Sequence, residues 1–279
     1  MTHKLWKLLP FVVALFTVRI AMAGVMVTEV TGKVELVGKG PVSLLAQIPD
    51  GSKLQVAAGA NLVVVDMSSG REFALAGGNT YLTSAAGPKT ADGKAVAAKS
   101  LPVNSLKEVR VAPGKLAQAT LVMRGLQADR LPVLLTPIRT AVVTVLPALQ
   151  WEAVVAATSY RLELTKLDGS LSWETTTTQT GVTVPQSHAL EPGERYSWRV
   201  AAIGQSSKLS DSSGRFSVAS KESIENLNLL VPGPDASFGR KVLYATQLQE
   251  AGAVQQAKEL WKTLASERPE DQTLAELAK

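Results

Sequence analysis

Apolar and polar residues alternate along the first part of the chain. The period of two is clear at 34–36, 53–56 and 72–75, and glycine or asparagine turn residues separate these stretches. Such alternation is typical of β-strands, whose successive side chains point to opposite faces. The segment Leu-Val-Val-Val at 62–65 has no polar face and predicts a central strand covered on both sides. Residues 24–112 are therefore expected to form an all-β domain.

Alternation returns with greater regularity in residues 135–219. It is strict at 196–200, Trp151 stands early in the segment, and Tyr196 follows a Pro-Gly turn. Short strands separated by turns, with a tryptophan and a tyrosine placed in this way, predict a small antiparallel sandwich. Trp151 and Trp198 are expected in its core, since large aromatic side chains are usually buried.

Beyond Ser220 the apolar period lengthens from two to between three and four residues, which is typical of amphipathic helices. Pro232 and Gly252 interrupt the pattern, and Pro269 separates off a last short stretch. Residues 220–279 are therefore expected to form a short helical hairpin with a brief helix before and after it. The expected helical segments are residues 224–230, 242–248, 254–264 and 274–277.

Residues 113–134 join the two β regions. Further strands or a short helix from Leu116 to Leu126 would both fit, and we treat the segment as a connection. The chain is thus predicted to be mainly β, with an N-terminal β domain, a β-sandwich and a short C-terminal α-helical hairpin.

The first 23 residues predict a cleavable signal peptide. Two lysines precede an apolar stretch, 8–18, and Ala21-Met22-Ala23 supplies the small-x-small pattern that a signal peptidase reads. The apolar stretch is shorter than the roughly twenty residues that a membrane-spanning helix needs. We therefore expect cleavage before Gly24 and a periplasmic protein that does not span the membrane. Secretion beyond the outer membrane stays open.

Charge and cysteine content narrow the function classes. Removing residues 1–23 takes away three of the 29 basic residues and none of the 24 acidic ones, which leaves a net charge of about +2. No dense basic block remains, so a nucleic-acid partner is not expected. The chain has no cysteine, which excludes disulfides, a thiol nucleophile and thiolate metal sites.

Catalysis requires a base, a nucleophile or a metal held on a scaffold. The one histidine beyond the leader, His188, lies in an expected loop, and no Gly-x-Ser-x-Gly turn supports a serine triad. One histidine without cysteine does not build the usual zinc sites, and the glycines form no phosphate-binding loop. We therefore expect no enzyme, no catalytic residue, no metal and no cofactor.

The sandwich segment resembles a fibronectin type III domain. The pattern that carries the resemblance is Leu190-x-Pro192-Gly193-x-x-Tyr196-x-Trp198-x-Val200, over residues 135–219. The resemblance implies an immunoglobulin- or fibronectin-like sandwich in which Tyr196 makes a corner hydrogen bond and Trp198 packs in the core. It implies little about function.

The C-terminal segment resembles a single tetratricopeptide repeat. One repeat buries too little apolar surface to stand alone, so we expect it to lean on the sandwich, a second subunit or a partner. The residues at the repeat's characteristic positions are Ala245, Leu248, Gly252, Ala257, Trp261 and Pro269.

The N-terminal β segment, 24–112, resembles the periplasmic domain of FecR-type regulators. In that family the domain passes a signal from an outer-membrane transporter to a cytoplasmic sigma factor. Residues 56–61 lack the Gly-Asp and Thr-Gly steps usual in the family, so the resemblance implies the fold and not the sigma-factor role. The matching motifs are Val30-x-Gly32-x-Val34-x-Leu36, Asp50-Gly51-x-x-Leu54, Leu62-x-Val64 and Ser69-Gly70-x-x-Phe73-x-Leu75.

These patterns together predict a non-enzymatic, periplasmic interaction or scaffold protein of the cell envelope, with a role in envelope signalling open. We expect an envelope protein or a second copy to bind an exposed face of the hairpin that includes Val242, Thr246 and Gln249. The alternative is a carbohydrate- or peptidoglycan-associated module that uses Trp173, beside an edge strand at 175–178.

Overall fold

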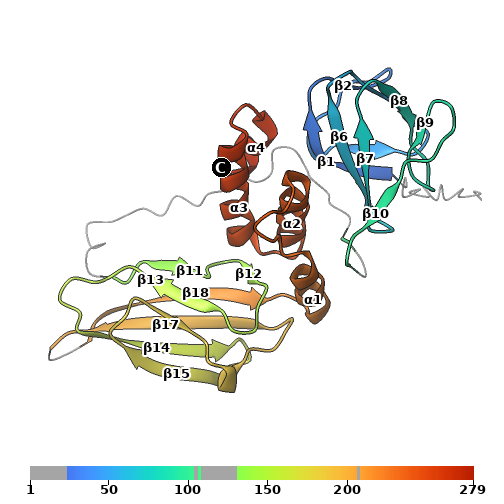
Figure 1. The fold of residues 1–279 in the computed structure, drawn as a ribbon. Coiled ribbons are helices and arrows are strands. Elements are labelled where there is room, and N and C mark those ends of the chain that lie inside the picture. Colours follow the sequence, from blue (N-terminus) through green and yellow to red (C-terminus); the bar gives the residue numbers. More distant parts are fainter. Residues whose placement is uncertain (1–23, 104–105, 108–130, 206–207) are drawn as a thin grey trace, which may run out of the picture.

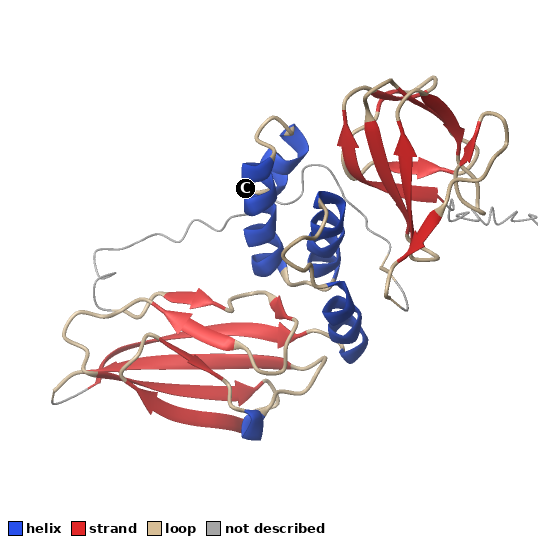
Figure 2. Ribbon diagram, viewed as in Figure 1, coloured by secondary structure: helices blue, strands red, loops and turns tan. Residues whose placement is uncertain are grey.

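The computed structural model describes residues 24–103, 106–107, 131–205 and 208–279 (Figure 1). The predicted signal peptide and the alternatives for Leu116 to Leu126 lie outside these residues. The described chain is mainly β, with several antiparallel sheets and four short helices near the C-terminus, as predicted (Figure 2).

The N-terminal β domain contains two five-stranded antiparallel sheets, in the orders β10-β7-β6-β1-β4 and β3-β2-β5-β8-β9. Its strands are β1 (Gly24–Thr31), β2 (Val34–Leu36), β3 (Gly40–Pro41), β4 (Gln47–Pro49), β5 (Lys53–Val56), β6 (Asn61–Asp66), β7 (Arg71–Ala76), β8 (Asn79–Leu82), β9 (Lys89–Thr90) and β10 (Ala98–Ser100).

Strands β1 and β6 are covered on both faces, which confirms the central strand expected at 62–65. Val27 and Val64 face the domain's own core. Met26 and Val65 point the opposite way, because side chains alternate along a strand, yet both are also buried. This second face of the sheet therefore needs a cover from outside the domain.

The sandwich contains a three-stranded sheet, β11-β13-β16, and a five-stranded sheet, β12-β18-β17-β14-β15. The pairings are antiparallel except between β12 and β18. Its strands are β11 (Leu134–Thr136), β12 (Ala141–Val142), β13 (Ala148–Trp151), β14 (Ser159–Lys166), β15 (Leu171–Thr177), β16 (Gly181–Thr183), β17 (Arg195–Ile203) and β18 (Lys208–Val218), with a 3₁₀ turn at η2 (Gln186–His188).

The aromatic core of the sandwich is the one predicted. Trp151 and Trp198 are buried with ring centroids 6.3 Å apart. The backbone N–H of Glu191 donates to the Tyr196 hydroxyl at 2.9 Å, which is the expected corner hydrogen bond. Trp198 donates from Nε1 to the Pro137 carbonyl at 2.9 Å, so its polar end is satisfied inside the core.

The C-terminal segment forms α1 (Lys221–Leu230), α2 (Phe238–Glu250), α3 (Val254–Glu267) and α4 (Gln272–Leu277). Side-chain oxygens of Ser220, Ser237 and Asp271 accept backbone N–H groups at the starts of α1, α2 and α4, which satisfies donors that a helix leaves free. Gly252 has φ +79°, a left-handed conformation that favours glycine, and it turns the chain from α2 into α3.

The helices lie between the two β domains (Figure 1). Their apolar stripes form one cluster that includes Ala245, Ala257 and Trp261, as the 3.6-residue period predicts. The same cluster contains Met26 and Val65 of the N-terminal β domain. The helices therefore supply the cover that β1 and β6 need.

Trp198→Ala should lower the free energy of unfolding of the sandwich by about 3–5 kcal/mol, the usual cost of truncating a fully buried aromatic side chain. Trp173→Ala should cost less than half as much, because Trp173 is only partly buried. Urea denaturation followed by circular dichroism measures both. A larger loss for Trp173→Ala would contradict the assignment of the core.

Candidate functional site

The predicted binding face of the hairpin is not exposed. Val242 and Thr246 are buried, with exposed fractions of 0% and 2%, so the expectation that they face solvent is wrong. The physical reason is that α2 packs against β1 of the N-terminal β domain, which covers this side of the helix. The Thr246 hydroxyl donates to the Leu243 carbonyl at 2.7 Å and needs no outside partner.

Gln249, the third residue of that predicted face, is half-buried. Its Oε1 accepts from Trp261 Nε1 at 3.2 Å, which ties α2 to α3. Its side chain thus serves packing within the helices. The structure brings Val242, Thr246 and Gln249 together on α2, but as part of an internal contact.

Trp173 lies in the sandwich, away from these helical residues. It pairs with Leu164 across β14 and β15, and the directly opposed residue Leu164 is buried in the core, so Trp173 shares the core face. Its ring centroid is 6.3 Å from that of His188, on the exposed turn η2. Strand β15 is an edge strand of its sheet, as expected for this segment.

The surface that the helices cover on the N-terminal β domain is called here the docking face: Met26, Leu44, Leu45, Val65 and Leu101. All five are buried, with exposed fractions of 8% or less, and all belong to the cluster of the helices. Burial of this much apolar surface favours a fixed contact, since each large aliphatic side chain contributes roughly 1.5–3 kcal/mol when removed from water.

Gly239 of α2 lies close to strand β1, next to the docking face. A Cβ at this position would lie 3.2 Å from the Thr28 hydroxyl oxygen and 3.5 Å from Glu29 Oε2. A side chain at this position would crowd the Thr28 and Glu29 side chains. The glycine therefore lets α2 lie close against the side chains of β1.

Arg268, which directly follows α3, links the helices to strand β1. Its Nη2 lies 2.7 Å from Glu29 Oε1, and its guanidinium carbon lies 3.5 Å from the centre of the Phe238 ring. Both members of the ion pair are largely withdrawn from solvent, so salt screens this pair less than an exposed one.

Gln247 of α2 holds the chain that leaves the N-terminal β domain. Its Oε1 accepts from the Lys107 backbone N–H at 3.0 Å, and its Nε2 donates to the Lys107 carbonyl at 3.1 Å. Lys107 Nζ also lies 2.9 Å from the Ser223 hydroxyl on α1. A buried side-chain amide that hydrogen-bonds both the backbone N–H and the backbone carbonyl of one residue fixes the position of that residue.

On the other side, the start of α3 binds the sandwich. The Gln255 side chain accepts from the Ile138 N–H at 3.1 Å and donates to the Leu135 carbonyl at 3.0 Å. The Gly252 carbonyl accepts from the Ala141 N–H at 2.8 Å. The start of α3 is thus tied to the sandwich by polar contacts, whereas the docking face is apolar.

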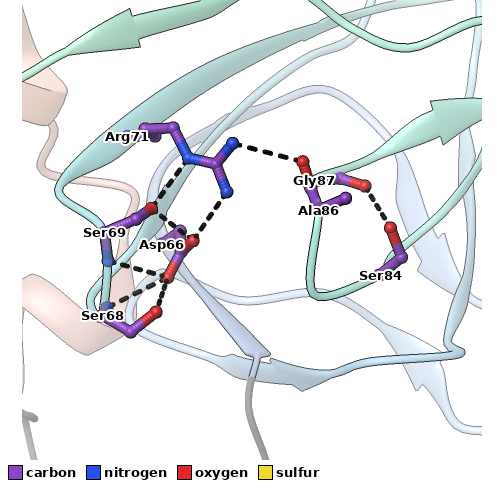
Figure 3. Close-up of polar contacts among 7 residues, drawn as sticks. All are labelled: Asp66, Ser68, Ser69, Arg71, Ser84, Ala86 and Gly87. Atoms are coloured by element: carbon purple, nitrogen blue, oxygen red, sulfur yellow. Dashed lines mark hydrogen bonds and ion pairs between the residues drawn. The ribbon is translucent and has the colours of Figure 1, made fainter.

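The turn between β6 and β7 closely follows Val65 of the docking face and is held by a network of polar contacts (Figure 3). The Asp66 carboxylate accepts from both Ser68 and Ser69 and forms an ion pair with Arg71 at 3.3 Å. Arg71 reaches from there to the Ala86 carbonyl at 3.3 Å. Burial alone would raise the pKa of Asp66, but the hydrogen bonds from Ser69 and Ser68 outweigh it and lower the pKa below its ordinary value of 3.8.

Within the described ranges, no group of three potential metal ligands is found. The His188 ring Nδ1 lies 3.0 Å from the Ser187 hydroxyl. No helix in the described part of the chain is long and apolar enough to cross a bilayer.

No protein-family model matches the chain, and no curated protein is significantly similar to it. Solved structures similar to it include a Fn3-like protein from Clostridium thermocellum, with 20% identity and a TM-score of 0.25 over 31% of this chain and 93% of that one. The FN5 domain of Drosophila Lar has 16% identity and a TM-score of 0.21 over 31% and 95% of the two chains. The twitchin kinase region of C. elegans has 18% identity and a TM-score of 0.26 over 33% and 16%. TM-scores this low do not indicate a ligand or a partner.

Sequence reasoning missed the docking face, Gln247, Gln255 and Arg268. One signal was present: the run at 62–65 has no polar face, which requires a cover on its second side. The two glutamines lie on helices where polar residues are ordinarily solvated, so their contacts across more than a hundred residues leave no local pattern.

We expect stability to depend on Asp66 at neutral pH. Because its pKa is lowered in the folded protein, its stabilisation is fully present well above the ordinary pKa of 3.8 and is lost as pH falls through the folded pKa. Asp66→Asn should therefore cost about 1–2 kcal/mol at pH ~7 and clearly less at pH ~3. Urea denaturation at the two pH values measures this.

Asp50→Asn, in another turn of the same domain, is the control for that experiment. It should cost less than Asp66→Asn at pH ~7, because Asp50 lies outside the hydrogen-bonded turn between β6 and β7. An Asp66→Asn cost that is the same at both values would contradict the role given to the carboxylate.

Proposed function

We propose that this chain is a non-enzymatic scaffold protein of the cell envelope, in which the C-terminal helices hold two β domains in one fixed arrangement. The observation that carries the proposal is the two-sided contact of α2 and α3. One side buries the docking face, and the other hydrogen-bonds the sandwich through Gln255 and Gly252.

Fixed spacing between two surfaces is useful to a protein that binds partners. Two flexibly linked domains lose orientational entropy when both bind a partner. Two domains already held in a fixed arrangement do not lose it on binding. The resemblance of residues 24–112 to FecR-type periplasmic domains supports a place in the envelope, and the leader pattern at 1–23 supports export. The tetratricopeptide resemblance supports a packing role for the helices, since a solitary repeat needs a neighbour.

The carbohydrate alternative depends on an exposed aromatic platform. Trp173 shares the core face of the sandwich and packs against its apolar cluster, so only part of the indole is open to a sugar. This placement favours the scaffold role over the carbohydrate-binding role.

The scaffold proposal predicts that a charge in the docking face will separate the β domains. Leu44 lies in a loop, contacts the helical cluster and is 3% exposed, so Leu44→Asp places a carboxylate in the contact at a cost of several kcal/mol. Small-angle scattering should then show a larger radius of gyration, with the circular dichroism of the strands retained.

Leu82→Asp is the matched control, because Leu82 belongs to the same β domain but is 48% exposed. It should leave the radius of gyration unchanged. A variant Leu44→Asp as compact as the original chain would show that the helices do not set the domain arrangement.

Export is tested by expression in a Gram-negative host, followed by fractionation and N-terminal sequencing. We expect a mature protein in the periplasmic fraction that begins at Gly24, because Ala21 and Ala23 are the well-placed small pair after the apolar stretch. Recovery of intact Met1 in the membrane pellet would contradict export by cleavage.

A further inference from the structure

The outer face of the five-stranded sandwich sheet carries charges that are compensated in one half. Residues directly opposite each other on neighbouring strands share a face, which places Arg161, Glu163 and Arg199 together on the side away from the core. Arg161 pairs with Glu174 at 2.8 Å, and Arg199 pairs with Asp211 at 2.6 Å. Each arginine in this half therefore has a carboxylate.

The other half of the same face carries arginines without carboxylates. Arg195 opposes Ser217, and Arg215 opposes Ser197, so the two arginines are diagonal neighbours on β17 and β18. Arg139 joins them, because its backbone N–H donates to the Arg215 carbonyl at 2.7 Å. Among the residues that the structure describes, none of the three forms an ion pair.

Nearby carboxylates are already engaged. Glu191 and Glu194 precede Arg195 in the sequence, but Lys166 Nζ lies 2.9 Å from one and 3.6 Å from the other. Like charges on neighbouring strands of a sheet are unfavourable, so an anion bound between Arg195 and Arg215 would be stabilising.

The three arginines line one open cavity, called here the arginine cavity, of about 420 Å³. Leu167 and Ser217 contribute to its lining, and the turn between α2 and α3 closes one side at Gly252. The Thr140 hydroxyl holds this turn by donating to the Gly252 carbonyl at 3.3 Å. The volume of the arginine cavity lies within the range of about 300–1,000 Å³ that is usual for small-molecule sites.

Arg139 has a backbone conformation that its residue type disfavours. Its φ of 50° lies in the left-handed region, where residues other than glycine are uncommon. Such conformations concentrate at ligand-binding sites, where the surrounding structure holds them. Here the hydrogen bond from Arg139 N–H to Arg215 supplies the restraint.

We propose that the arginine cavity binds a small ligand that carries at least two negatively charged oxygens, as phosphate or as clustered carboxylate. Guanidinium groups present forked donors that match both oxyanions, and three of them around one cavity suit more than one charge. Leu167, which is 48% exposed at the rim, offers an apolar contact for the rest of the ligand. This site goes beyond the scaffold role and does not use the docking face.

Isothermal titration calorimetry of the full chain at low ionic strength tests the proposal, with inorganic pyrophosphate and citrate as probes. Arg139→Gln, Arg195→Gln and Arg215→Gln should each weaken binding about tenfold, the size expected for losing one charge-assisted hydrogen bond. Binding of pyrophosphate alone identifies a phosphate ligand, binding of citrate alone identifies a carboxylate ligand, and binding of both supports the shared oxyanion chemistry.

Arg161→Gln is the matched control, because it removes the same charge from the same face but from the compensated half. It should leave the affinity unchanged, with folding of every variant checked by circular dichroism. If neither probe binds, or if Arg161→Gln weakens binding as much as the cavity variants, the proposal is overturned. Failure of one cavity variant to fold leaves the other two to decide the outcome, and Leu44→Asp tests the scaffold role separately.

Discussion

The arrangement of the molecule depends on the second apolar face of strands β1 and β6. A half-buried antiparallel sheet ordinarily turns one face to water, but here Met26 and Val65 make that face apolar. The N-terminal β domain alone would expose this face, which favours association or aggregation. Covering it with the chain's own helices removes that hazard and places the helices between the two β domains.

The helices need the contact as much as the sheet does. A unit of four short helices has too little core to offset the conformational entropy that it loses on folding. Val242 and Thr246 complete the core only because β1 lies against them. The polar contacts of Gln247 and Gln255 then choose one orientation among those that apolar packing alone would allow, since a buried amide must be satisfied.

The sequence predicts the features that depend on residues close together in the chain, and it does not predict those that depend on distant ones. The alternation at 196–200, the Tyr196 corner and the helix limits at Gly252 and Pro269 depend on neighbours in sequence, and the structure confirms them. The exposed face predicted on α2 was wrong because its outcome depends on a strand more than two hundred residues away. Periodicity identifies which side of a helix is apolar, but it does not say whether the opposite side is also covered.

The outer face of the sandwich shows the same limit for charge. In the composition, Arg161, Arg199 and Arg215 contribute equally to a small net charge. Only the register of β14, β17 and β18 shows which arginines lie beside a carboxylate and which do not. In the paired half of the sheet, Arg161 and Arg199 each have a carboxylate on a neighbouring strand. A carboxylate beside each remaining arginine would likewise be more stable than none. Departures from the locally stable choice are expected where a site must remain open for a ligand, and the arginine cavity is such a place.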